Sequence, residues 1–214
     1  MQTLSAQLRE SRRTAARNYS QQLQENEHAL EYLIGERGLT PEMISRFGLG
    51  FVSEPSPEDH KFIGRISIPY LTRCPVRGAS VVAMKFRSLD NGETPKYDTH
   101  PGNKRFLYNA GALLRDTDYI CITEGEFDAI SAEQAGLSCV GLPGAQRWKP
   151  RMARLFLGYS RVIVLSDNDE PGQQFAKAIA GDVPNLENIT MPDDDVNTTL
   201  CLRGGDYIKE MVKV

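Results

Sequence analysis

The chain has 214 residues, four cysteines and a net charge of −3 at pH 7, and this length can bury the core of one domain or of two small ones. It has no apolar run of membrane-spanning length, it begins with polar and basic residues instead of a secretory signal, and none of its cysteines form a C-x-x-C pair. These properties exclude a membrane protein, a disulfide framework and a zinc ribbon, and they predict a protein of the reducing cytoplasm.

The first part of the chain predicts helices. Residues 1–30 are polar and carry several arginines, which is typical of an exposed helix, and an apolar stripe follows over residues 29–34. Thr40 is expected to cap a further helix whose first residue is Pro41, because proline is favoured at that position. The glycines at the end of this stretch predict the end of the helix.

Short strands are expected next. A loop rich in proline and acidic residues over residues 54–59 leads to two predicted strands, at residues 66–70 and 80–87, with a turn between them. A polar, basic loop then runs through Lys96, Lys104 and Arg105. We expect this part to form a small basic α+β subdomain over residues 1–110.

After Gly111 the pattern changes to alternating strands and helices. Apolar runs predict strands over residues 119–123, 137–141, 161–166 and 188–191. Amphipathic stretches predict helices near residues 126–136, 148–157, 171–180 and 206–213. Such alternation predicts a mostly parallel sheet flanked by helices, so the fold class is α/β and the second domain covers residues 111–214.

Charge is distributed unevenly between the two parts. Residues 61–108 hold nine Lys or Arg and three Asp or Glu, whereas residues 111–214 hold ten basic and sixteen acidic residues. A basic part beside an acidic part is consistent with a polyanion track that leads to a metal-charged site. A solvated mixed surface would have the same composition.

Acidic clusters follow the predicted strands at 119–123 and 161–166. Glu124 and Asp128 come after the first, and Asp167 and Asp169 come after the second. Carboxyl ends of parallel strands meet at one edge of a sheet, and several carboxylates cannot all stay ionised there without a cation. Their oxygens are the ligands that Mg²⁺ or Mn²⁺ prefers, so we expect a protein that handles phosphates through metal.

Each cluster also has a purely structural interpretation. Glu124 and Asp128 could be the acidic first turn of a helix. An Asx turn with a helix N-cap would explain one of the aspartates at 167 and 169 but not the other. The run 193–195 and Asn197, after the next strand, could form a solvated turn. Three such clusters at successive strand ends favour the metal site.

Three motifs together resemble a known module. They are E-G-x-x-D at residues 124–128, S-D-x-D-x-x-G at 166–172 and D-V-N at 195–197. In this order they are similar to the Toprim module shared by primases, topoisomerases and some nucleases. Upstream, the chain resembles the RNA polymerase core of bacterial and phage-type primases in its segments Tyr32-Leu33, Arg37-Gly38-Leu39, Gly64–Pro69, Met84–Leu89 and Pro95-Lys96-Tyr97.

The resemblance implies a DNA primase core that makes short RNA primers on single-stranded DNA from ribonucleoside triphosphates. It implies catalytic and metal-binding roles for Glu124, Asp167 and Asp169, and a metal-binding role for Asp195, with two Mg²⁺ or Mn²⁺ ions and no zinc. Asp128 and Asn197 would support this site. The family's basic motif matches Arg87 and Lys96, with Lys104 and Arg105 close behind, and these four would contact the nucleic acid or the triphosphate.

The departures from the family pattern concern partners. Bacterial primases usually carry a zinc-binding domain before this region and a helicase-binding domain after it, and this sequence matches neither. A replicative helicase or a separate zinc-binding primase subunit is therefore an expected partner. Two alternatives remain open: a Toprim nuclease that uses the same acids, and a non-catalytic module that binds single-stranded DNA within a replication complex.

Overall fold

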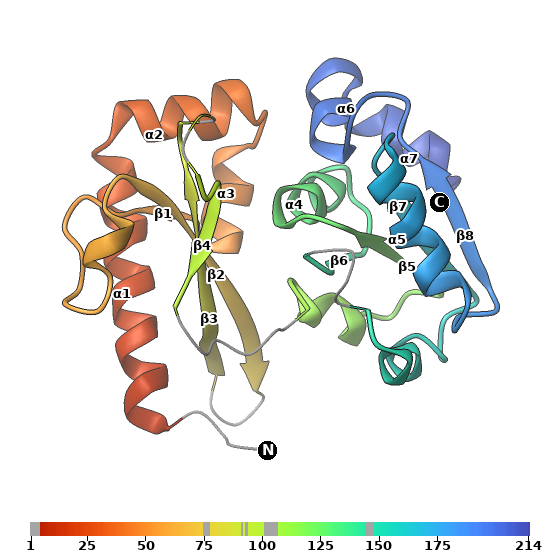
Figure 1. The fold of residues 1–214 in the computed structure, drawn as a ribbon, viewed down its shortest axis with the longest axis horizontal. Helices are drawn as coiled ribbons and strands as arrows, with labels where there is room; N and C mark the ends of the chain where they lie inside the picture. Colours follow the sequence, from red (N-terminus) through yellow and green to blue (C-terminus); the bar gives the residue numbers. More distant parts are fainter. Residues whose placement is uncertain (1–4, 75–77, 91, 93, 101–106, 144–147) are drawn as a thin grey trace. The chain divides into compact units, whose positions relative to one another are not determined.

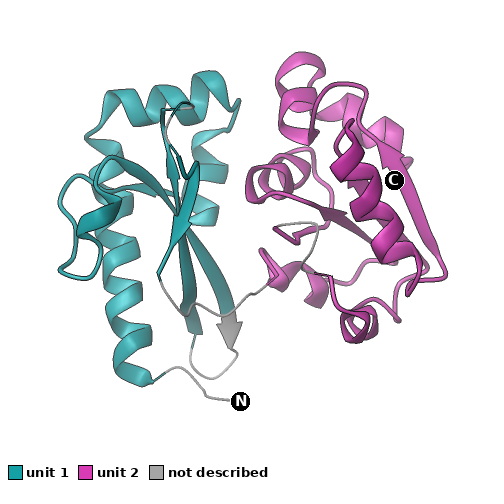
Figure 2. Cartoon of the chain, in the orientation of Figure 1, with its two compact units in different colours: residues 1–104 teal, residues 105–214 magenta. Residues whose placement is uncertain are grey.

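The computed structural model describes residues 5–74, 78–90, 92, 94–100, 107–143 and 148–214. Contacts divide the chain into two compact units, which we call unit 1 (residues 1–104) and unit 2 (residues 105–214) (Figure 2). The boundary expected after residue 110 therefore falls inside unit 2. In the part of the chain that the structure describes, no helix is both long and apolar enough to cross a bilayer.

Unit 1 begins with helices. They are α1 (Ala6–Gln24), α2 (Glu27–Glu31), a π-helical turn η1 (Tyr32–Glu36) and α3 (Pro41–Phe47) (Figure 1). Thr40 caps α3 as expected, because its hydroxyl accepts a hydrogen bond from the Met43 amide at 3.3 Å, and Gly48 ends α3 with φ of 61°. The expected exposed first helix is corrected in one respect: α1 buries one face, formed by Ala15, Ala16, Tyr19 and Leu23.

The sheet of unit 1 is antiparallel, in the order β1-β2-β3-β4. Its strands are β1 (Gly50–Phe51), β2 (Arg65–Cys74), β3 (Gly78–Ser88) and β4 (Tyr97–Thr99), and a short 3₁₀ turn η2 (His60–Phe62) precedes β2. The strands expected at residues 66–70 and 80–87 are β2 and β3. They pair as a hairpin, and each is longer than the sequence indicated. Helix α1 packs on this sheet, and Tyr19, Phe62 and Phe86 are central to the core between them.

A buried polar network joins α1 to the loop before β2. Asp59 is only 2% exposed and accepts hydrogen bonds from Tyr19 Oη at 2.5 Å and from Ser56 Oγ at 2.7 Å. His100 Nε2 lies 2.6 Å from the other carboxylate oxygen of Asp59. Burial alone would raise the pKa of Asp59, but the hydrogen bonds from His100, Tyr19 and Ser56 outweigh it and hold the pKa below its ordinary value.

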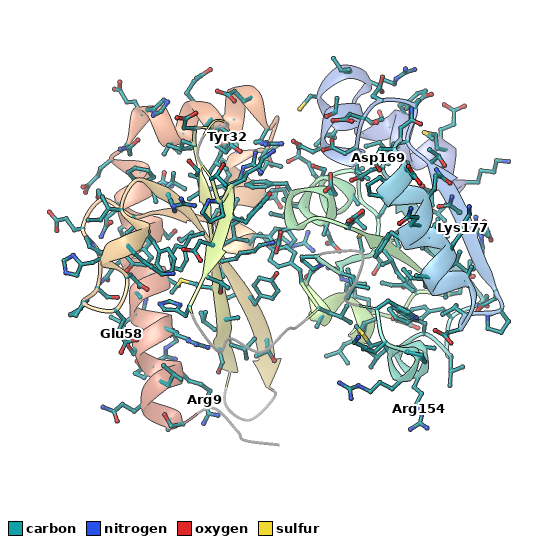
Figure 3. The ribbon with its side chains drawn as sticks, viewed as in Figure 1. Arg9, Tyr32, Glu58, Arg154, Asp169 and Lys177 are labelled. Atoms are coloured by element: carbon teal, nitrogen blue, oxygen red, sulfur yellow. The ribbon has the colours of Figure 1, made fainter. Side chains whose placement is uncertain are left out.

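Asp59→Asn is expected to lower the stability of unit 1 by about 2–3 kcal/mol, because hydrogen bonds to a buried charge are strong and the amide cannot accept all of them. Hydrogen exchange of the β2 and β3 amides measures this effect. Because the folded pKa is depressed, the stabilisation is present at neutral pH and is lost as the pH falls below 3.8 through the folded value. The control is Glu58→Gln, a change of the exposed neighbour labelled in Figure 3, and an equal loss in both variants would contradict the prediction.

The sheet of unit 2 is parallel, in the order β6-β5-β7-β8, and confirms the predicted α/β class. Its strands are β5 (Tyr119–Thr123), β6 (Cys139–Gly141), β7 (Arg161–Ser166) and β8 (Leu186–Thr190). The helices are α4 (Glu126–Gln134), α5 (Glu170–Ala180), α6 (Val196–Arg203) and α7 (Gly205–Val212), with 3₁₀ turns η3 (Ala110–Leu114) and η5 (Pro150–Leu155). Buried residues of the central strands, such as Ile122 and Val164, pack against Phe175 and Ile179 of α5.

Two helical expectations in unit 2 are corrected. The stretch 148–157, expected as a helix, contains only the short 3₁₀ turn η5. Trp148 and Phe156, which flank η5, are buried, whereas Leu155 and Leu157 are exposed, so the apolar residues of this stretch do not form one buried helical face. Helix α6 was not expected. Its β-branched residues Val196, Thr198 and Thr199 have low helix propensity, and the helix is instead fixed by its cap and by packing against α4 and α7.

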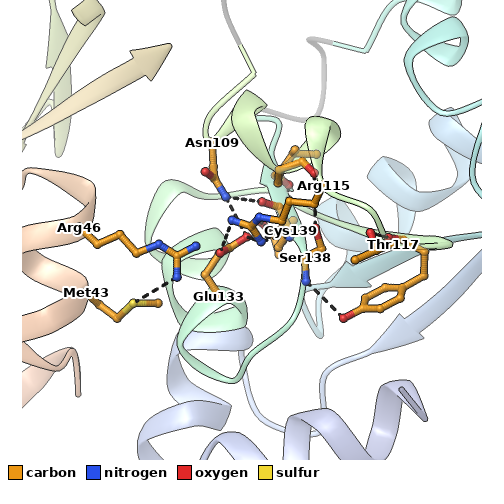
Figure 4. A network of polar contacts seen from close by, with 12 residues as sticks. Met43, Arg46, Asn109, Arg115, Thr117, Glu133, Ser138 and Cys139 are labelled. Atoms are coloured by element: carbon orange, nitrogen blue, oxygen red, sulfur yellow. Dashed lines mark hydrogen bonds and ion pairs between the residues drawn. The ribbon is translucent and has the colours of Figure 1, made fainter. Parts of the chain in front are cut away.

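An ion pair between Arg115 and the buried Glu133 joins the segment before β5 to α4 (Figure 4). Arg115 donates to Glu133 through both terminal nitrogens, at 2.7 and 2.8 Å, and the Glu133 side chain is 1% exposed. Glu133 also accepts from Asn109 Nδ2 at 2.9 Å and from the Cys139 amide at 3.0 Å. The network therefore ties the segment before β5 to α4 and β6.

Candidate functional site

Acidic side chains follow three neighbouring strands of the unit 2 sheet. Strand β7 pairs with β5 on one side and with β8 on the other, and all three run in the same direction. Their carboxyl ends therefore share one edge of the sheet, where α/β proteins place their ligands. The acidic residues that come directly after these strands are Glu124 and Asp128, Asp167 and Asp169, and Asp195.

The turn after β5 is shaped by the close approach of Asp128 to Gly125. Asp128 is 8% exposed in the first turn of α4, and a Cβ atom at residue 125 would lie 2.2 Å from its Oδ2. Glycine leaves room for the carboxylate in this position, and a larger residue would require the carboxylate to move. The backbone of Gly125 is in the extended region, so the requirement is one of space and not of a left-handed conformation.

Two of the aspartates cap helices. Asp169 Oδ1 accepts from the Gly172 amide at 2.7 Å at the start of α5, and Asp195 Oδ1 accepts from the Thr198 amide at 2.6 Å at the start of α6. The Asn168 amide also donates to the Asp194 carbonyl at 2.8 Å, which joins the loop after β7 to the loop after β8. These bonds fix the positions of both carboxylates relative to the sheet edge. Asp169 is labelled in Figure 3.

Asp167 lies in the field of the other carboxylates. Its Oδ1 is buried and has no hydrogen-bond partner within the described part of the chain. Burial, followed by the charges of Asp128, Glu124, Asp195 and Asp169, raises the pKa of Asp167 to about 8. At neutral pH this carboxyl therefore retains a proton unless a cation offsets the negative charge around it.

The donor set fits a hard divalent cation. A buried carboxylate oxygen without a partner, surrounded by four further carboxylates, is the chemistry that Mg²⁺ and Mn²⁺ select. Over the described ranges, no group of three or more His, Cys, Asp or Glu side chains is already arranged to hold an ion. Like charges repel, so binding of an ion requires these side chains to turn toward it.

Asn197 and Asp128, the two residues predicted to support the site, contact each other in the structure. The Asn197 amide donates to Asp128 Oδ1 at 3.2 Å, and its side-chain nitrogen donates to Ser131 Oγ at 2.9 Å. Asn197 is 2% exposed and Ser131 is fully buried. Ser131 was missed by the sequence analysis, because a serine inside a helix gives no signal of its own. The three residues hold α6 against α4 at the acidic edge.

In unit 1, Arg87 is the centre of a cluster with two tyrosines. Its Nε donates to Tyr32 Oη, its Nη1 donates to Tyr97 Oη at 2.7 Å, and the residue is 2% exposed. Arg37 Nε donates to the same Tyr32 oxygen at 2.9 Å, and Lys85 Nζ lies 4.2 Å from the centroid of the Tyr97 ring. Tyr32 is the first residue of the π-helical turn η1, an element often found at functional sites.

The remaining expected residues of the basic motif differ in their surroundings. Lys96 is exposed just before β4, and its carbonyl accepts from the Ser88 amide at 3.0 Å. Lys104 and Arg105 lie outside the described residues. Tyr32, Arg37 and Lys85 were not singled out as site residues. Lys85 is close to Arg87 in the sequence, whereas the signal for Tyr32 and Arg37 was their place in segments that resemble primases.

Comparison with known proteins gives a consistent picture. Residues 121–200 match a family model described as Toprim-like. The chain is 49% identical over 150 residues to the Gene 57 protein of Mycobacterium phage D29, a match that covers 70% of this chain and 98% of that protein. It is also 26% identical over 239 residues to the DNA primase of Thermotoga maritima, and there it covers 92% of this chain but 41% of the relative.

Solved structures agree in fold. A structure described as the DnaG primase catalytic domain bound to ssDNA superposes with a TM-score of 0.72 at 24% sequence identity. The match covers 97% of this chain and 77% of that one. The fold of both units is thus that of a primase catalytic core, and the acidic edge of unit 2 lies within the residues that match the Toprim-like model.

Proposed function

Because the chain belongs to the family of bacterial and phage-type primases with a Toprim domain, we propose that it joins ribonucleoside triphosphates into short RNA primers on single-stranded DNA. It spans 41% of the length of the Thermotoga maritima primase, so the activity of that longer protein is part of this proposal and not a premise. The observation that carries the proposal is the cluster of five carboxylates at the ends of β5, β7 and β8, centred on Asp167.

In this proposal Glu124, Asp167, Asp169 and Asp195 hold two Mg²⁺ or Mn²⁺ ions, and no zinc takes part. When bound, the ions supply positive charge to the triphosphate oxygens as a 3′-hydroxyl displaces pyrophosphate. The helix caps of Asp169 and Asp195 hold these two side chains at the edge before any ligand arrives. Asp167 gives up its proton when the local charge becomes less negative. Asp128 and Asn197 keep α4 and α6 in place.

The basic residues of the chain have the chemistry to bind polyanions. We assign the contacts to template or triphosphate to Arg87, Lys96, Lys104 and Arg105. The burial of Arg87 against Tyr32 and Tyr97 supports a role in which it orients these rings as well as lending its charge. The structure of a DnaG primase catalytic domain bound to ssDNA, which has a similar fold, supports the proposal that the template is single-stranded DNA. A replicative helicase or a separate zinc-binding primase subunit is the partner we expect in the host cytoplasm.

Primer synthesis tests the proposal directly. The chain is incubated with single-stranded DNA, labelled ribonucleotides and Mg²⁺ or Mn²⁺, and products are separated by size. We expect short RNA chains that disappear when a chelator removes the metal. Cleavage of the DNA without ribonucleotides would establish a Toprim nuclease instead. DNA binding without either product, and unaffected by Mg²⁺, would establish a non-catalytic binding module and would contradict the proposal.

A further inference from the structure

A groove of about 790 Å³ lies within unit 1, and no residue of the Arg87 cluster is among its described lining. It runs between α1, α3 and the β2–β3 hairpin, and Figure 1 shows α1 lying along this sheet. Its floor is aliphatic and includes Ile44, Leu71 and Val81. Ile34 lies at its rim and is 44% exposed, an unusual position for a large apolar side chain. The volume is sufficient for several side chains of a ligand.

One wall of the groove is cationic. Arg13 and Arg17 are four residues apart on α1 and therefore lie on the same face of the helix. Arg17 is exposed, and Arg13 makes an exposed ion pair with Glu10, which does not line the groove. Among the described residues that line the groove there is neither an Asp nor a Glu. The groove thus combines an aliphatic floor with a wall that carries two arginines, and no acidic residue is among its described lining.

These features select among possible occupants. Nucleic acid binds to single-strand sites largely by stacking on aromatic rings, and the described lining contains none. An added β-strand would have to pair with β2 beyond the two-residue strand β1, and Pro69 of β2, which lines the groove, has no N–H to donate there. An amphipathic helix needs neither rings nor donors, because its apolar side chains fill the groove and its flanking charges meet the wall.

We propose that this groove binds an acidic amphipathic helix of a partner protein. Aliphatic side chains of that helix enter beside Ile34, Ile44 and Val81, and its Asp or Glu residues face Arg13 and Arg17. The inference depends on unit 1 alone and does not require primer synthesis. A failure of the primase assay would leave it standing, and its own failure would leave the proposed function standing.

A designed peptide is the probe for this site. It is a labelled 18-residue helix with Leu at helical spacing and Glu on the flanks, and a second peptide carries Lys in place of every Glu. Fluorescence anisotropy against the full chain measures both affinities. We expect the acidic peptide to bind more tightly, and the double variant Arg13→Glu with Arg17→Glu to weaken it by about tenfold. The same variant should bind the Lys peptide more tightly than the wild type does.

The controls distinguish binding of the peptide in the groove from nonspecific electrostatic attraction to the protein. The double variant Arg151→Glu with Arg154→Glu makes the same charge change on exposed residues of unit 2 and should leave the peptide affinity unchanged. Ile34→Asp removes the apolar rim without changing the arginines and should also weaken the acidic peptide; circular dichroism checks the folding of each variant. Absence of binding by the acidic peptide, equal affinity for both peptides, or an effect of the Arg13 and Arg17 changes on a single-stranded oligonucleotide alone would overturn the proposal.

Discussion

Asp167→Asn is expected to reduce primer synthesis by at least about 100-fold and, at the same time, to raise the melting temperature of the metal-free protein. The rate falls because charge stabilisation by bound metal contributes several kcal/mol to the transition state, and each 1.36 kcal/mol corresponds to about a tenfold change. The melting temperature rises because the change removes a buried carboxyl group that must keep its proton at neutral pH, well above its ordinary pKa of 3.8, in the field of four other carboxylates. Each kcal/mol of relief corresponds to about 2–4 °C.

The same substitution should change how stability depends on pH. Because the folded pKa of Asp167 is about 8 and the ordinary value is 3.8, the folded protein holds a proton that the unfolded chain releases between these values. The stability of the wild type therefore falls as the pH rises through this window, and Mg²⁺ offsets the loss. Thermal melts at several pH values, with and without Mg²⁺, measure both effects, and the variant should show a smaller dependence on each.

Asp116→Asn is the matched control for this experiment. Asp116 is exposed in the segment before β5, lies outside the acidic cluster, and loses the same charge on substitution. We expect it to leave primer synthesis and the response to Mg²⁺ unchanged. If Asp167→Asn retained normal synthesis, or if both variants lost it equally, the acidic edge would not be the catalytic site.

Glu133→Gln is expected to lower the free energy of unfolding of unit 2 by about 2–3 kcal/mol, since it removes a buried carboxylate charge that accepts hydrogen bonds from Arg115, Asn109 and the Cys139 amide. The new amide also directs N–H groups toward donors that the carboxylate accepted from, on Arg115, Asn109 or the Cys139 amide. Urea unfolding followed by tryptophan fluorescence measures the change. Trp148 is the single tryptophan of the chain and lies in the core of unit 2, so its signal reports on this unit.

Glu187→Gln provides the comparison for the buried pair. Glu187 also accepts two hydrogen bonds of 2.8 Å from one guanidinium, that of Arg161, but its side chain is 46% exposed. The geometry is therefore nearly the same while the surroundings differ. We expect a loss of about 1 kcal/mol or less, because water screens the exposed pair. Equal losses for the two variants would show that burial does not determine the strength of the Glu133 pair.

The acidic edge could be predicted from sequence because the same local pattern, an apolar run followed by acidic residues, occurs after more than one strand. Each cluster follows an apolar run, and parallel strands bring their carboxyl ends together whatever the details of packing. The N-cap interpretation accounted for one of Asp167 and Asp169, and in the structure Asp169 caps α5 while Asp167 Oδ1 remains without a hydrogen-bond partner. The residue that local structure could not explain is the one at the centre of the cluster.

Other features could not be predicted because they depend on residues far apart in the chain. Tyr19, Asp59 and His100 meet in one network although about 40 residues separate each from the next. The burial of Arg87 depends on Tyr32, which lies 55 residues earlier. The resemblance to primases implied that Arg87 contacts nucleic acid or the triphosphate, and it gave no indication of this burial. Only the packing of η1 and β4 against β3 reveals that two phenols accept from it.

The close approach of Gly125 and Asp128 couples the residues that these two positions can hold. A Cβ atom at residue 125 would lie 2.2 Å from Asp128 Oδ2, so any other residue at this position requires the carboxylate to move. A substitution of Gly125 would therefore displace the carboxylate that accepts a hydrogen bond from the Asn197 amide, and it would loosen the contact between α4 and α6. We therefore expect this turn to tolerate fewer substitutions than the exposed loops of unit 2, because a change of one residue here alters how two helices meet.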